Sequence, residues 1–142
     1  MLHQIILGSA VMLGTMLIAG LSFPLMEAAF ERFRPWLTQK PYHAKRMAVM
    51  MVAVLWVLGI MTAGVWLWAL TFRGLGLFED LEHAVYFSLV CFTTLGFGDV
   101  LLPEEWRLMG GLAAANGLLN IGVMTALLVE ALRDVRLMQR DN

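Results

Sequence analysis

The residues best placed to do chemistry lie in one short stretch, Thr93-Thr94-Leu95-Gly96-Phe97-Gly98-Asp99. Two hydroxyls, two alternate glycines and a carboxylate interrupt an apolar part of the chain. Glycine adopts positive φ at little cost, so Gly96 and Gly98 permit left-handed residues to alternate with ordinary ones. Successive carbonyls of such a ribbon can point to one side. Several copies around an axis would then form rings of oxygens around a dehydrated cation.

Other kinds of site find no support in the sequence. The chain has a single cysteine, Cys91, and three scattered histidines. It contains no Cys/His cluster, phosphate-binding loop, H-E-x-x-H or G-x-S-x-G pattern. We therefore expect no enzyme activity, no bound cofactor and no nucleic-acid partner.

The composition indicates a membrane protein. Of 142 residues, 60% are hydrophobic and only 15% are charged, well below the usual quarter of a soluble domain. Three runs without charge, 5–26, 47–72 and 108–129, are long enough to cross a bilayer, which takes about 20 residues of helix. Residues 79–103 are apolar only in their middle and too short to cross. We expect them to re-enter the membrane, surrounded by protein or a water-filled path.

The first run raises the alternative of a cleaved signal peptide. Its leader lacks a basic region, and basic residues follow the run instead, so we favour a retained helix over residues 1–30. Pro24 is expected to bend or end it. A basic loop is expected over residues 31–46.

Charge also predicts the orientation. Basic residues gather in the 31–46 loop and after the third run, whereas acidic residues surround the re-entrant segment. By the positive-inside rule, the N-terminus lies outside and the C-terminus in the cytoplasm.

The motif resembles the signature of the potassium channel superfamily, T-T-V-G-Y-G-D, with Leu in place of Val and Phe in place of Tyr. The resemblance covers about residues 47–135 and leaves the first helix outside. It implies an all-α membrane protein that assembles as a tetramer. Its pore domain would contain the following parts: an outer helix over 47–72, a pore helix over 80–93, a filter over 94–99 and an inner helix over 105–133, with a short cytoplasmic tail over 136–142.

The resemblance also implies a role for each filter residue. Carbonyls of Thr94, Leu95, Gly96 and Phe97 would coordinate K+, the permeating ligand. The Thr94 hydroxyl would complete the innermost site, and Gly98 would lie at the outer mouth.

Residues around the filter would support it. Thr93 and Asp99 continue the motif on either side. Phe97 lacks the phenol hydroxyl that, in relatives, bonds to aromatic residues of the pore helix; Tyr86 and Phe87 occupy those aromatic positions here. Some relatives carry at the position of Val90 a glutamate clamped to the aspartate after the filter, and valine cannot make that clamp.

The third run is expected to line the pore. Gly117 falls near the family's hinge glycine, and Gly122 near a small residue that lets the helices open. Asn116 and Asn120 are i,i+4 neighbours on one helix face. Because amides are costly against lipid, we favour their lining a water-filled cavity. Hydrogen bonding between helices is the alternative.

Since one chain carries one filter, several chains must share an axis, and the resemblance sets the number at four. We predict a homotetrameric, passive, K+-selective channel in a lipid bilayer, of the prokaryotic cell-membrane type. A weakly selective cation channel and a non-conducting pore-fold subunit remain alternatives. The first helix would stiffen the pore from outside the outer helix or dock an unidentified regulatory partner.

Overall fold

The structure, a computed structural model, describes residues 1–37 and 42–140. These contain no strand and fold into four α-helices and one short 3-10 turn. The elements are, in order, α1 (Leu2–Leu37), α2 (Tyr42–Gly74), α3 (Leu81–Phe92), the turn η1 (Glu104–Trp106) and α4 (Arg107–Arg140). The predicted all-α fold class is confirmed.

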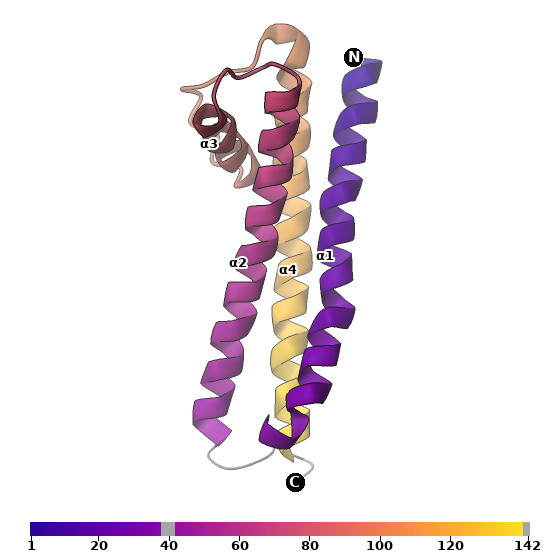
Figure 1. The fold of residues 1–142 in the computed structure, drawn as a ribbon, viewed down its shortest axis with the longest axis vertical. Helices are drawn as coiled ribbons and strands as arrows, with labels where there is room; N and C mark the ends of the chain where they lie inside the picture. Colours follow the sequence, from indigo (N-terminus) through magenta and orange to yellow (C-terminus); the bar gives the residue numbers. More distant parts are fainter. Residues whose placement is uncertain (38–41, 141–142) are drawn as a thin grey trace.

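The three long helices run side by side, and the short α3 lies near one end of the bundle (Figure 1). It packs against α2 and α4, whereas α1 packs against α4 and α2 on the other side. Each long helix contains a span long and apolar enough to cross a membrane: Leu2–Phe33, Met47–Gly74 and Glu104–Arg133. These three spans and the apolar composition indicate an integral membrane protein, and the 12-residue α3 is too short to cross a bilayer.

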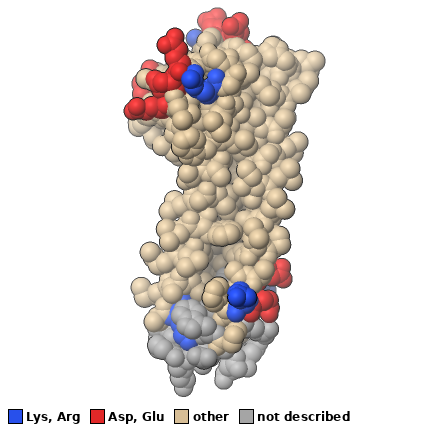
Figure 2. Space-filling view, viewed as in Figure 1, with Lys and Arg blue, Asp and Glu red and all other residues tan. Residues whose placement is uncertain are grey.

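Charged side chains lie at the two ends of the bundle and leave a broad uncharged band between them (Figure 2). Acidic residues gather at the end that carries α3 and η1, both of which have acidic first turns. The band is the part of the surface that hydrocarbon would cover.

The predicted loop over 31–46 is wrong in most of its length. Residues 31–37 continue α1, and α2 already begins at Tyr42; residues 38–41 lie outside the described part of the chain. The charges mark where the chain leaves hydrocarbon, but Ala, Glu, Lys and Arg are good helix formers in water as well. Pro24 does not end α1, which continues through it to Leu37. Likewise, residues 136–140 of the expected tail belong to α4.

Two apolar clusters hold the helices together. The larger surrounds α3 and includes Trp68, Phe72, Phe87 and Phe92; the smaller joins the three long helices nearer the opposite end. The rings of Phe72 and Phe87 meet edge to face with centroids 5.3 Å apart. Such aromatic contacts stabilise by about 0.5–1.5 kcal/mol beyond burial, so α3 is firmly packed on α2.

Candidate functional site

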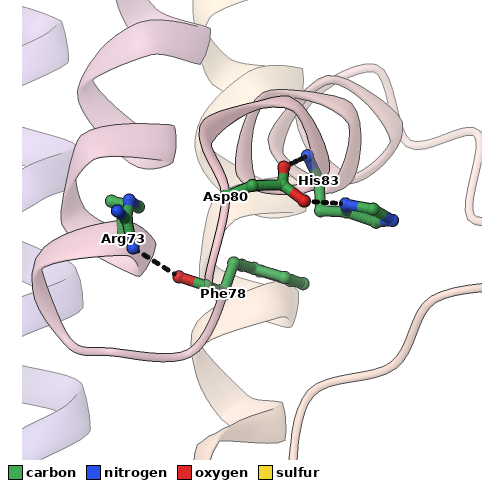
Figure 3. Close-up of polar contacts among 4 residues, drawn as sticks. All are labelled: Arg73, Phe78, Asp80 and His83. Atoms are coloured by element: carbon green, nitrogen blue, oxygen red, sulfur yellow. Dashed lines mark hydrogen bonds and ion pairs between the residues drawn. The ribbon is translucent and has the colours of Figure 1, made fainter.

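The start of α3 is fixed by three polar contacts (Figure 3). Asp80 is the N-cap: its carboxylate accepts the His83 backbone N–H at 2.8 Å and contacts His83 Nδ1 at 2.5 Å. Arg73, in the last turn of α2, donates to the Phe78 carbonyl at 3.1 Å and closes the connecting loop. The His83 N–H lowers the pKa of Asp80, since it stabilises the charged carboxylate.

The end of α3 is seated on two glycines. The Phe92 ring lies against Gly64 of α2, where an added Cβ would come within 2.9 Å of it. The Phe92 carbonyl oxygen lies against Gly117 of α4, where an added Cβ would be only 1.7 Å away. Any side chain at Gly117 would therefore collide with backbone, and the end of α3 cannot shift without moving α2 or α4.

Beyond Phe92 the chain turns out of the helix through a Schellman-type end. The Leu95 N–H donates to the Val90 carbonyl at 3.0 Å, and the Thr94 N–H donates to Cys91 at 2.8 Å. The Gly96 N–H also points at the Val90 carbonyl, at 3.3 Å. These bonds place Thr94 in the left-handed position that such a helix end usually gives to glycine.

The stretch that follows has an alternating backbone. Thr94, Gly96 and Gly98 have φ of 59°, 56° and 76°, whereas Leu95 and Phe97 between them do not have positive φ. Thr94 is the only non-glycine residue of the described chain with positive φ. For a β-branched residue this conformation is strained, by about 1–3 kcal/mol, and such strain concentrates at functional sites. The stretch is not helical, and its peptide groups can present carbonyls to one side.

No other part of the described chain covers this stretch. Residues 94–99 are exposed, and the large side chains of Leu95 and Phe97 are 57% and 66% exposed. The described chain therefore leaves the alternating backbone and both of these apolar side chains uncovered.

Tyr86, one of the two predicted aromatic support residues, contacts Asp99. Its phenol donates to the Asp99 carboxylate at 2.5 Å, so it ties the pore-helix region to the residue after Gly98. Val90, where a glutamate clamp was missing, is buried and apolar. The hydrogen bond from the Tyr86 phenol lowers the pKa of Asp99, since it stabilises the charged carboxylate. This contact with Asp99 could have been predicted from the sequence, because Tyr86 lies one helical turn before Val90, on the same helix face.

The favoured interpretation of Asn116 and Asn120 is wrong. Both are buried within the chain, with 0% and 2% of their surface exposed, and so do not face a cavity. The Asn116 amide oxygen accepts hydrogen bonds from Thr15 of α1 and Trp68 of α2. The alternative of bonding between helices is therefore the correct one. The sequence did not reveal that α1 would cover this face of α4.

The remaining predicted residues fall into two groups. Phe87 is buried in the cluster around α3, and the Thr93 hydroxyl donates to the Leu89 carbonyl at 2.7 Å, which completes the helix end. Gly122 has nothing within 4 Å of an added Cβ. Helix α4 continues unbroken through Gly117 and Gly122, so their roles in opening stay predictions.

Comparison with known proteins gives one match. A protein-family model described as "Ion channel" matches residues 49–134, more than half of the chain. The matched region contains most of α2, all of α3, the alternating stretch and most of α4, and it leaves α1 outside. No curated protein and no solved structure matches.

Replacing Tyr86 by Phe should raise the pKa of Asp99 towards its ordinary value. Because the folded-state pKa of Asp99 is lowered, the Tyr86 bond is present at neutral pH and is lost as pH falls through that pKa. Carbon-13 NMR of the aspartate carboxyls in micelles should therefore give Asp99 a lower titration midpoint in the wild type than in Tyr86→Phe. Asp80, capped by its own helix, serves as the internal control and should not move. An unchanged Asp99 midpoint would show that the phenol does not hold the carboxylate.

Replacing Gly117 by Ala should destabilise the protein. Glycine to alanine inside a helix normally stabilises by about 0.5–1 kcal/mol, but here the methyl group meets the Phe92 carbonyl, and overpacking of that kind costs about 1–3 kcal/mol. Thermal unfolding in detergent, followed by circular dichroism, should show a lower midpoint than the wild type. Gly122→Ala on the same helix has open space and should not lower it. Equal midpoints for the two variants would contradict the close contact.

Proposed function

This chain belongs to the ion channel family, and from that premise we propose that it forms a passive, K+-selective pore. The observation that carries the proposal is the alternating backbone at Thr94, Gly96 and Gly98. Ion channels select among cations by replacing the hydration shell with rings of backbone carbonyls. The energy for transport comes only from the ion gradient.

The coordinating atoms in this proposal belong to the backbone. Carbonyls of Thr94, Leu95, Gly96 and Phe97 face the axis, and the Thr94 hydroxyl completes the innermost site. Gly98 forms the outer mouth. The Leu and Phe side chains point away from the ions, so their difference from the family signature leaves the oxygens in place.

Four copies of the chain surround the axis. One chain alone leaves its filter backbone and the side chains of Leu95 and Phe97 uncovered, and a closed ring of identical chains covers them. The number four follows from the resemblance of the motif to that of potassium channels. The basic residues next to the long helices support an orientation with the filter and N-terminus outside a cell membrane.

Acidic side chains at the filter end fit this orientation. Asp80 and Asp99, both with lowered pKa, stay ionised at neutral pH, and Glu82, Glu104 and Glu105 add negative charge nearby. Exposed charges of this kind concentrate cations locally, over about 8 Å at physiological salt.

Gly96→Ala should abolish selective K+ flux while the protein still inserts and assembles. An L-residue held at φ of 56° is destabilised by about 1–2 kcal/mol, enough to change the local conformation, although an added Cβ meets nothing within 4 Å. Gly76→Ala is a matched control. Gly76 has φ of 71° and equally open space, but it lies in the loop before α3. Flux and reversal potentials are measured in liposomes with opposed K+ and Na+ gradients.

Three outcomes distinguish the possibilities. Selective flux lost in Gly96→Ala and kept in Gly76→Ala supports the filter. Wild-type reversal potentials near zero would contradict K+ selectivity and indicate a weakly selective cation channel. Absence of any Ba2+-sensitive flux in the wild type would favour a non-conducting subunit.

The stoichiometry is a separate prediction. Native mass spectrometry of the protein released from detergent micelles should count four chains per particle, because four ribbons are needed to surround a dehydrated K+ ion. A monomer or a dimer that still conducts would exclude the shared-axis filter.

A further inference from the structure

A buried amide joins the three long helices beside the end of α3. The Asn116 side-chain oxygen on α4 accepts a hydrogen bond of 2.8 Å from the Trp68 indole on α2 and lies 2.8 Å from the Thr15 hydroxyl on α1. The single Thr15 proton is shared between Asn116 and the Met12 carbonyl of its own helix, which is also 2.8 Å away. Thr15, Trp68 and Asn116 are 1%, 0% and 0% exposed. This three-helix contact links α1 and α2 through α4, and α1 lies outside the family match.

A second amide strengthens the same contact. Asn120, one turn further along α4, donates to the Asn116 backbone carbonyl at 3.0 Å and lies 3.4 Å from the Thr15 hydroxyl. Thr15 therefore contacts both asparagines. Because lipid offers no competing hydrogen bonds, these contacts define which face of α4 turns towards α1.

The rotation of α4 about its axis determines whether Gly117, the residue after Asn116, faces the end of α3. Gly117 follows Asn116 and receives the Phe92 carbonyl, with no space for a side chain. Residues of a helix follow each other by about 100° of rotation, so turning α4 would bring a side chain against Phe92 in place of the glycine. Phe92 is in turn followed directly by Thr93 and Thr94, where the alternating backbone begins.

The rest of α1 contacts the same half of α4. An added Cβ at Gly8 would come within 2.4 Å of the Leu112 side chain, Gln4 donates to the Glu105 carbonyl, and the His3 and Trp106 rings meet edge to face at 5.4 Å. Helix α1 thus contacts η1 and α4 as far as Asn120, and its Ala19 packs in the cluster further along α4 with Met124 and Leu127.

We propose that Thr15 is a positioning residue of the filter: through Asn116 it holds α4 in the rotation at which Gly117 accommodates the Phe92 carbonyl. The proposal rests on the filter assignment above and gives α1 a role in ion selectivity. Thr15 itself touches no ion and lines no pore.

The test replaces Thr15 by Val, which keeps the shape and removes the hydroxyl. Thr15→Ser keeps the hydroxyl and should rescue. Ser22→Ala is the matched control, since Ser22 lies on the same helix, is 3% exposed, and donates only to the Ala19 carbonyl of its own helix. We expect the K+/Na+ permeability ratio, from reversal potentials in liposomes, to fall about fivefold in Thr15→Val, which corresponds to about 1 kcal/mol. It should stay at the wild-type value in the other two variants.

Hydrogen exchange in lipid nanodiscs gives a second readout that does not depend on conduction. The Leu95 and Gly96 amides donate to the Val90 carbonyl, so exchange in a peptide covering residues 93–99 reports the filter backbone. It should be faster in Thr15→Val and unchanged in Ser22→Ala, while the cluster that contains Leu127 stays protected in both. Wild-type selectivity and exchange in Thr15→Val would overturn the proposal. An unselective wild type with faster exchange in Thr15→Val would instead refute the proposed function and keep the positioning role.

Discussion

The constraint on which this structure depends is that backbone leaving a helix at membrane depth must find partners for its polar groups. The chain leaves its helix at Thr93, and the bonds from Thr94, Leu95 and Gly96 to the last turn of α3 satisfy the first freed groups. The left-handed positions beyond allow the following carbonyls to point together. In the proposed function their partner is a cation shared with other chains. On that proposal, the strained conformation of Thr94 and the exposure of the stretch have one cause, an assembly in which other chains cover the stretch.

The position of that stretch is set by repulsion at short range more than by hydrogen bonds. Phe92 meets Gly64 of α2 with its ring and Gly117 of α4 with its carbonyl, and neither glycine has room for a methyl group. Steric contact rises steeply with displacement, so two such contacts fix the end of α3 more closely than one exposed hydrogen bond would. The Tyr86–Asp99 bond secures the other end of the stretch. The alternating stretch is therefore held at both ends, while its centre is not covered by the described chain.

Sequence predicted the parts that depend on local rules. Runs of apolar residues located the three spans, and alternate glycines located the left-handed positions, because both follow from chain geometry alone. Thr94 as a third left-handed residue was not foreseen, since its conformation is imposed by the helix end before it. Asn116 was misjudged for a different reason. Whether an amide meets water or another helix depends on which helix lies beside it, and no local pattern in α1 announces its packing on α4.

That packing joins α1 to the part of the chain, residues 49–134, that matches the ion channel family. An unpaired amide facing hydrocarbon is costly, and α2 supplies only the Trp68 donor for Asn116. Without α1, Asn116 and Asn120 would lose Thr15 and the cover that keeps both almost fully buried. The sequence of α4 thus places amides on the face opposite α3, where they need a neighbouring helix to bury them. Helix α1 thus contacts the same turn of α4 in which Gly117 accommodates the Phe92 carbonyl, and this is the basis of the positioning role proposed for Thr15.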